Sequence, residues 1–175
     1  MRQLRRGAAA GLGAALVALL LLALPGIAAA GPIEDLQGSW ATAPDAAPSM
    51  QWTGGAGGFS VAWTPPGGTV TTVQYTPAGR PGVFGGKAKD GWSIMGSMFG
   101  NDGTVNPLDG GALHWARSTA AEVYLYRMEI DDKGGFAIDR YAVRLADGTL
   151  GIVGDRRTAE GGEQLPEQRL VRTGP

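Results

Sequence analysis

The stretch "EVYLYRMEIDDKGGFAIDRYAVRLADGTLGIVGDRRT", residues 122–158, decides the fold class of this chain. It contains three runs rich in β-branched and aromatic residues, separated by Asp131-Asp132-Lys133-Gly134-Gly135 and by Asp147-Gly148. Asp and Gly are typical of tight turns, because they hydrogen-bond to nearby backbone or adopt positive φ. The spacing therefore predicts three sequential antiparallel strands, at Glu122 to Ile130, Phe136 to Leu145 and Thr149 to Thr158.

The middle strand changes the phase of its apolar residues. Phe136 and Ile138 lie in one phase, whereas Tyr141, Val143 and Leu145 lie in the other. A β-bulge near Asp139-Arg140 would reconcile the two halves. A regular strand that is partly buried on both faces would explain the pattern equally well, so both interpretations stay open.

The rest of the chain after residue 37 also alternates with period two, the spacing of a strand rather than a helix. Phe59, Val61 and Trp63 are one such face, and Leu113 and Trp115 are another. Counting weaker segments, we expect an all-β domain of about eight to ten antiparallel strands at short spacing. Short sequential connections favour an up-and-down barrel over a sandwich, because a sandwich usually needs crossing connections.

The first 30 residues resemble an export signal. Arg2, Arg5 and Arg6 precede an apolar run from Ala8 to Leu24, and Ala28-Ala29-Ala30 suits a cleavage site. We therefore expect a signal peptide at 1–30 and a single barrel domain at 31–175, located in the periplasm or outside the cell. An uncleaved membrane anchor is the competing interpretation. The export route, general or twin-arginine, stays open.

Charge and cysteine content exclude several classes of protein. Without the three arginines of the signal, 12 basic residues face 16 acidic ones, a net charge of −4. Such a balance does not predict a nucleic-acid or anionic-membrane surface, and no second apolar run predicts membrane insertion. The chain has no cysteine, which excludes disulfides, thiolate metal sites and lipid attachment at a cysteine.

Leu36-Gln37-Gly38-Ser39-Trp40 resembles the Gly-x-Trp signature that opens the first strand of lipocalins and of the wider calycin group. The second lipocalin signature, Thr-Asp-Tyr, has no counterpart here. The resemblance implies that a short helical turn, 32–36, leads into the first strand. It also implies that Gly38 and Trp40 plug one end of the barrel, with Arg169 or Arg172 packed on the indole. A core tryptophan in another β fold is the alternative.

Residues with catalytic or metal-binding chemistry make a weak case. His114 is the only histidine, and if Leu113 and Trp115 point inward then His114 points outward, which argues against catalysis or metal binding. The acidic residues beside turns or near the expected start of the mature chain usually face water; these are Glu34, Asp35, Asp131, Asp132, Glu160 and Glu163.

The loop from Asn101 to Asp109 is oxygen-rich but lacks the EF-hand spacing. Residues 54–58, "GGAGG", are expected to form a hairpin turn rather than a phosphate-binding loop. We expect no catalytic residue, metal or cofactor.

Bulky residues on the expected inner phase of the strands suggest a ligand site. They either fill a small barrel completely or line a pocket with a few polar groups. Glycines within strands favour a pocket, because missing side chains leave room; these are Gly85, Gly86, Gly96, Gly151 and Gly154. The candidate ligand-binding residues are Trp63, Trp92, Met98, Trp115, Tyr124, Tyr126 and Met128.

These observations predict an exported, lipocalin-like barrel that binds a small hydrophobic or amphipathic molecule without chemistry. An alternative is a ligand-free structural or interaction module of the cell envelope. In that case Val123 and Leu125, apolar on the face opposite Tyr124 and Tyr126, would contact an envelope partner or a second copy. A third hypothesis is an isomerase or cyclase, since some calycin-like barrels support such chemistry.

Overall fold

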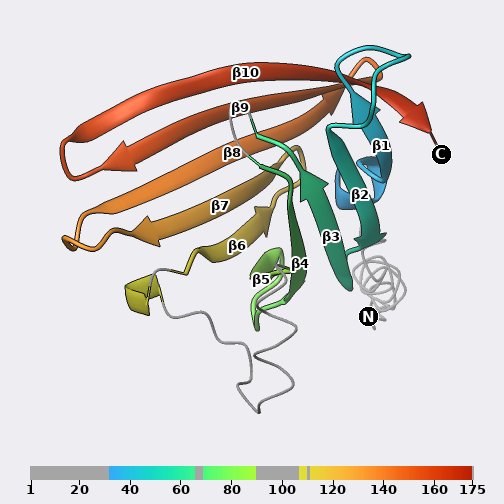
Figure 1. The fold of residues 1–175 in the computed structure, drawn as a ribbon. Helices are drawn as coiled ribbons and strands as arrows, with labels where there is room; N and C mark the ends of the chain where they lie inside the picture. Colours follow the sequence, from blue (N-terminus) through green and yellow to red (C-terminus); the bar gives the residue numbers. More distant parts are fainter. Residues whose placement is uncertain (1–31, 66–68, 90–106, 110, 175) are drawn as a thin grey trace, which may run out of the picture.

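The computed structural model describes residues 32–65, 69–89, 107–109 and 111–174, and it confirms an all-β, antiparallel, closed barrel of ten strands. The chain contributes one short α-helix and one 3-10 turn to this described part (Figure 1). The elements are α2 (Pro32–Asp35), β1 (Gly38–Ala41), β2 (Met50–Gly55), β3 (Gly58–Trp63), β4 (Thr71–Pro77), β5 (Val83–Ala88), η1 (Pro107–Asp109), β6 (Leu113–Ser118), β7 (Val123–Ile130), β8 (Phe136–Ala146), β9 (Thr149–Thr158) and β10 (Gly161–Gly174).

The barrel closes by a simple up-and-down path. Each strand pairs with its neighbours in sequence, and β1 pairs with both β2 and β10. The predicted strands at 122–130, 136–145 and 149–158 correspond to β7, β8 and β9. Figure 1 shows β7 to β10 as long strands that run past the shorter β2 to β6 on one side of the molecule. Within the described residues, no helix has the length and apolar character needed to cross a membrane.

Hairpin turns form at the segments where Asp and Gly residues predicted them. Asp147 and Gly148 have φ of 51° and 73°, so both adopt the left-handed conformation between β8 and β9. Asp131 Oδ1 accepts hydrogen bonds from the amides of Lys133 and Gly135, at 2.9 and 2.8 Å, and so orders the β7–β8 turn. Residues 54–58 connect β2 to β3 as a hairpin.

The strand with two apolar phases contains no bulge, so that interpretation was wrong. β8 keeps an unbroken register with β7 and with β9. Asp139 occupies an inner position in phase with Tyr141 and Val143, and it is only 3% exposed. The alternative of partial burial on both faces fits better, since Ile138 on the outer face is also half-buried. The phase changes in sequence because a carboxylate takes an inner position.

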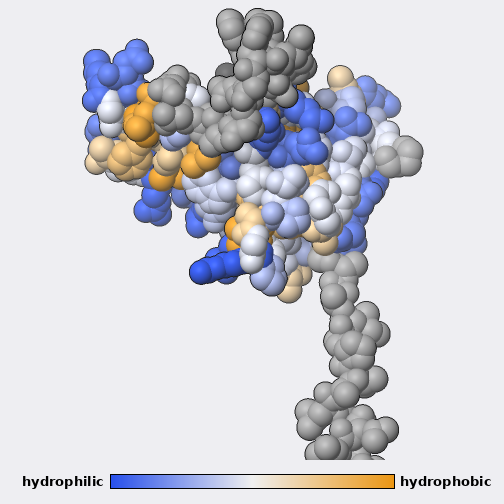
Figure 2. All heavy atoms as spheres, turned by 90° about the horizontal axis from the view of Figure 1, so that it is seen from below, coloured by the Kyte–Doolittle hydropathy of each residue, from blue (hydrophilic) through white to orange (hydrophobic). Residues whose placement is uncertain are grey.

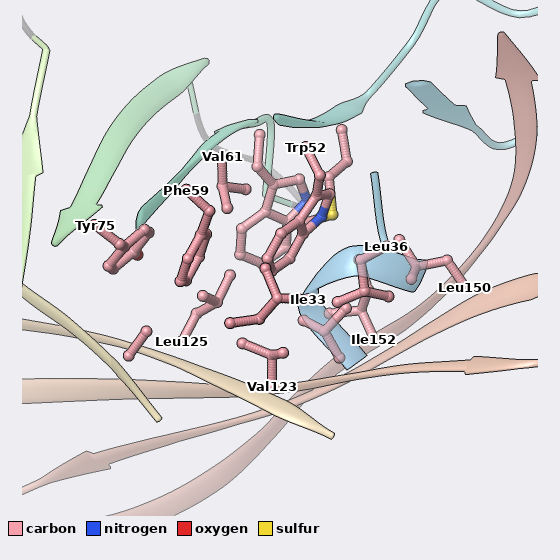
Figure 3. Packing of buried hydrophobic residues seen from close by; sticks show 14 of the residues in the cluster. Ile33, Leu36, Trp52, Phe59, Val61, Tyr75, Val123, Leu125, Leu150 and Ile152 are labelled. Carbon is pink, nitrogen blue, oxygen red and sulfur yellow. The ribbon is translucent and has the colours of Figure 1, made fainter. Parts of the chain in front are cut away.

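The buried apolar core fills the barrel at the end covered by α2. Ile33 and Leu36 lie against Trp52, Leu150 and Ile152 in Figure 3. The core also includes Trp40, Met50, Val123, Val143 and Leu170, each no more than 1% exposed. Burying this much apolar surface is the main favourable contribution to folding.

The residues expected to plug the barrel meet at this same end. Trp40 Nε1 donates a hydrogen bond to the carbonyl of Leu36 at 2.8 Å. The Arg172 guanidinium carbon lies 4.6 Å from the centroid of the Trp40 ring, and its nitrogens donate to the carbonyls of Gln37 and Asp35 at 2.7 and 2.9 Å. Arg169 is the other candidate, but it pairs with Glu167 at the surface. Arg172 therefore closes the end of the barrel by binding both the indole face and the turn before β1.

Candidate functional site

One row of inner-face residues crosses seven neighbouring strands, from β4 to β10. Each member stands directly opposite the next in the strand register. We call it the polar row, because all of its members except one glycine carry a polar or charged group. Its members are Tyr75, Gly86, His114, Arg127, Asp139, Arg156 and Glu163.

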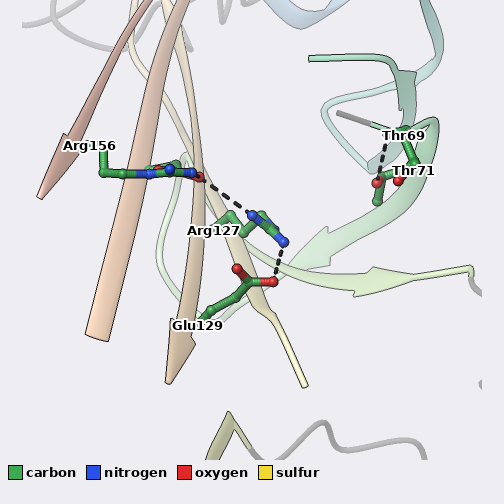
Figure 4. A network of polar contacts seen from close by, with 6 residues as sticks. Thr69, Thr71, Arg127, Glu129 and Arg156 are labelled. Carbon is green, nitrogen blue, oxygen red and sulfur yellow. Dashed lines mark hydrogen bonds and ion pairs between the residues drawn. The ribbon is translucent and has the colours of Figure 1, made fainter. Parts of the chain in front are cut away.

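Asp139 is the centre of an ion-pair network in this row. Arg156 donates to it twice, from Nε to Oδ1 at 2.7 Å and from Nη2 to Oδ2 at 3.0 Å. Arg127 Nη1 lies 3.5 Å from Oδ2, and Arg127 also pairs with Glu129, as Figure 4 shows. The Asp139 hydrogen bond raises the pKa of Arg156 above its ordinary value. Two guanidinium groups thus offset the cost of burying one carboxylate.

The next inner row toward the core is apolar. It runs Phe84, Ala116, Leu125, Tyr141, Gly154 and Leu165 in register from β5 to β10. Along β7 and β8, the barrel interior therefore changes from charged to apolar between one inner position and the next, two residues away.

Two strand glycines make room for aromatic rings of the site. A Cβ added at Gly154 would lie 2.7 Å from Tyr141 Cδ1, and one at Gly86 would lie 2.7 Å from Tyr75 Cε1 and 2.8 Å from His114 Cβ. Rings over strand glycines are a known device in curved sheets. These two glycines do leave room, as expected, but the protein's own tyrosines occupy it.

A cavity of about 190 Å³ lies where the polar and apolar rows meet. Val61, Val73 and Leu125 form apolar parts of its wall, and Trp63, Tyr75 and Tyr141 form aromatic parts. His114 and Arg127 border it as well. Two contacts hold Trp63 in the wall. Its Nε1 donates a hydrogen bond to Gln168 Oε1 at 3.1 Å, and its ring packs edge-on against Tyr141 with 4.4 Å between the ring centroids.

The hydroxyls of Tyr75 and Tyr141 have no hydrogen-bond partner within the part of the chain that the structure describes. Tyr75 is only 3% exposed, and burial raises its pKa well above the ordinary value. Burial is also the main cause that raises the pKa of Tyr141, ahead of the nearby Asp139 charge. Both phenols are therefore neutral near pH 7 and able to donate a hydrogen bond into the cavity.

The predicted ligand-binding residues divide between the two faces of the barrel. Trp63 borders the cavity, and so does Tyr126, although the Tyr126 ring stacks on Trp115 at 4.9 Å on the outer face. Trp115, Tyr124, Tyr126 and Met128 all share this outer face, so their expected inward orientation was wrong. Trp92 and Met98 lie outside the described residues.

The smaller residues of β7 face inward instead of the aromatic ones. Val123 is 0% exposed and Leu125 5%, so the contact surface expected from these two residues is not at the surface. The reason is space: the interior beside β7 is already occupied by Val143 and Tyr141, which stand opposite Val123 and Leu125. Branched aliphatic residues fit there, whereas two large rings do not.

His114 also lies on the inner face, because the faces of β6 and β7 are the reverse of those expected. It is 7% exposed and borders the cavity, so the expected outward orientation was wrong. Because His114 borders the cavity, its orientation no longer counts against an enzyme. No group of three metal-ligating side chains occurs among the described residues, and the loop from Asn101 to Asp109 falls mostly outside them.

The site residues that the sequence analysis missed carried a recognisable signal. Arg127 and Glu129 are in phase with Val123 and Leu125, and Asp139 is in phase with Tyr141. Opposite charges on the apolar phase of neighbouring strands indicate an internal ion pair. Using that signal requires knowing which phase is internal, and the aromatic residues suggested the wrong one.

A scan against protein-family models, a search of curated proteins and a search of solved structures each found no match. The closed antiparallel barrel is compatible with a lipocalin-like or calycin fold. Membership of that group stays a prediction from Gly38, Trp40 and the arginine above the indole.

Proposed function

We propose that this protein binds a small molecule in the cavity between the polar and apolar rows, without transforming it. The observation that carries the proposal is Tyr75, which is 3% exposed, borders the cavity and has a hydroxyl without a partner among the described residues. A polar group placed in a mostly apolar cavity wall is typical of ligand sites, where it fixes the orientation of the ligand. A ligand that accepts a hydrogen bond would give the Tyr75 hydroxyl a partner.

The size of the cavity limits the ligand. A cavity of roughly 150 Å³ accepts benzene, and sites for drug-sized ligands are usually about 300–1,000 Å³. At about 190 Å³, this cavity suits a single ring with a short substituent, or a branched aliphatic group of similar volume. Apolar burial against Val61, Val73 and Leu125 would supply most of the affinity.

We further propose that the chain is exported and that binding occurs in the periplasm or outside the cell. The supporting observation is the pattern of residues 1–30, with arginines before a long apolar run and small residues after it. Mass spectrometry of the protein from its own cells tests this, since the mature chain should start near Gly31. An intact N-terminus on protein recovered from the cytoplasm would contradict export.

Two readouts on one panel test ligand binding. Single-ring apolar compounds are titrated into the protein while tryptophan emission and melting temperature are recorded. A ligand at about 100 times its Kd should stabilise the fold by about 2.7 kcal/mol, which is several degrees. Among the described residues, Trp63 is the tryptophan that lines the cavity, so Trp63→Phe should remove the emission change and keep the thermal shift.

Val73→Phe is the matched control for the cavity itself. A ring added at this apolar wall fills the space that the ligand would occupy. The variant should retain the fold, judged by its circular dichroism spectrum and cooperative melting, and lose both responses. If the wild-type protein responds to no compound in either readout, a binding function is wrong.

A further inference from the structure

The polar row has a regular alternation of charge. Reading from β10 to β7, Glu163 is negative, Arg156 positive, Asp139 negative and Arg127 positive. After Arg127 the row continues into the cavity wall with His114 and, across Gly86, with Tyr75. His114 takes the next position, where an alternating row would have a negative group, so a negative group in the cavity beside Arg127 would continue the alternation.

The two arginines share the buried carboxylate unequally. Arg156 holds both oxygens of Asp139 at 2.7 and 3.0 Å, whereas Arg127 has a single approach at 3.5 Å. Asp139 therefore holds Arg127 less closely than it holds Arg156. Its second partner, Glu129, has a side chain that is 44% exposed, so water weakens that pair. Arg127 borders the cavity, and Arg156 does not number among its lining residues.

Three polar groups of the wall, besides His114, Thr69 and Thr71, favour a ligand that accepts hydrogen bonds. Tyr75 and Tyr141 each present a neutral hydroxyl that can donate, and Arg127 can only donate. Among the described residues that line the cavity, none is acidic. A ligand carboxylate would meet donors from three strands, and a ligand ammonium group would meet the Arg127 guanidinium.

We propose that the ligand is a compact carboxylate: an apolar body of about one ring, with its carboxyl group bound by Arg127, Tyr75 and Tyr141. This inference rests on the proposed binding function and adds the ligand's charge and orientation to it. The body lies against Leu125, Val61 and the Trp63 ring, and the carboxylate continues the charge alternation of the polar row. The mode is a charge-assisted anchor combined with apolar burial.

Three probes of one shape separate charge from burial. They are para-isopropylbenzoate, para-isopropylbenzyl alcohol and para-isopropylbenzylammonium, titrated into the full protein by isothermal calorimetry, with ligand-observed NMR for weak binding. The benzoate should bind at least about tenfold more tightly than the alcohol, because a hydrogen-bonded charge pair is worth about that factor. The ammonium compound should bind more weakly than the alcohol.

Variants assign the effect to the residues. Tyr75→Phe removes a hydroxyl without a partner, and Arg127→Gln removes the charge while keeping a polar side chain. Each should weaken benzoate binding about tenfold and weaken alcohol binding less, because a hydrogen bond to a charged group is stronger than one to a neutral hydroxyl. Tyr124→Phe is the matched control, because its hydroxyl donates to Glu122 on the outer face at 2.5 Å and should not matter.

The outcomes distinguish this inference from the function on which it rests. If the alcohol binds as tightly as the benzoate, or if Tyr75→Phe and Arg127→Gln weaken both probes equally, the carboxylate assignment is wrong and binding by burial stands. If none of the three probes binds and Val73→Phe behaves like the wild type throughout the panel, the binding function fails with it. If Arg127→Gln does not fold, Tyr75→Phe decides alone.

Discussion

The two halves of the barrel interior solve the same packing problem differently. In the half under α2, Trp40, Leu150 and Leu170 fill the space, and each is 0% exposed. In the other half, Arg127, which pairs with Asp139, borders a cavity. Tyr75 and Tyr141 border it as well, and their hydroxyls have no partner among the described residues. The first half contributes stability, whereas the second leaves a cavity that is bordered by side chains able to donate hydrogen bonds. Proteins commonly accept such a local cost at binding sites.

The largest effect should come from the filled half. Trp40→Ala removes the indole that contacts Arg172 and bonds to Leu36, and it leaves a large void in a region that cannot collapse. We expect a loss of about 3–5 kcal/mol in the free energy of unfolding. Urea denaturation followed by circular dichroism measures it.

Trp115→Ala is the control for that change. Trp115 lies on the outer face, half-buried against Tyr126, so its removal leaves no internal void. The expected loss is about 1 kcal/mol. Equal losses in the two variants would show that the end beneath α2 is not the stabilising half.

Removing the buried carboxylate should have the next largest effect. Asp139→Asn leaves Arg127 and Arg156 without their shared partner. Breaking a fully buried pair costs about 3–5 kcal/mol, but both guanidinium groups are more than a third exposed, so we expect about 2 kcal/mol. The same urea experiment measures it. Arg140→Gln, which loses the surface-side pair with Asp155, should cost less.

The sequence predicted the topology of this barrel better than its faces. Asp147-Gly148 and the 54–58 turn carry their conformations locally, so hairpins could be identified without knowledge of the rest of the fold. The face of β7 depends on the space opposite it, which no local pattern reports. Both Val123–Leu125 and Tyr124–Tyr126 are apolar enough to be internal, and the interior admitted the smaller pair.

The site was hidden for the same reason. Arg127, Asp139 and Arg156 are far apart in sequence, and only the register of β7, β8 and β9 brings their side chains together. The sequence around Tyr75 does not mark it as a site residue, because the space for its ring comes from Gly86 on the neighbouring strand. The sequence showed that polar residues were present on the strands, but the network and the cavity are properties of the strand pairing.

A strand glycine offers a sharper test of the cavity wall. Gly154→Ala would place a methyl group 2.7 Å from the Tyr141 ring, with Leu165 Cβ at 3.2 Å on the other side. The ring, which borders the cavity, must shift, so we expect a loss of about 1–3 kcal/mol and weaker ligand binding. Thermal melting and calorimetry with the benzoate probe measure the two effects.

Gly151→Ala on the same strand is the matched control. Its nearest atom to an added Cβ would be the Arg144 carbonyl oxygen at 3.8 Å, an ordinary contact on the outer face. Stability should change by less than about 0.5 kcal/mol, and binding should not change. A large effect at Gly151, or none at Gly154, would contradict the assignment of the ring positions.

The smallest effect on stability should come from the residue that matters most for binding. Tyr75→Phe removes a hydroxyl without a partner among the described residues, so near pH 7 the free energy of unfolding should stay within about 0.5 kcal/mol of the wild type.

The pH dependence of stability tests the state of the Tyr75 hydroxyl. Above about pH 10, unfolded tyrosines lose their protons, whereas burial raises the pKa of folded Tyr75 and keeps it protonated. The unfolded state then binds fewer protons, so wild-type stability should fall as the pH rises. Urea titrations between about pH 8 and 11 should show a smaller fall in Tyr75→Phe than in the wild-type protein. Equal slopes would indicate that Tyr75 is not held neutral in the cavity wall, and its role as a donor to the ligand would fail with that result.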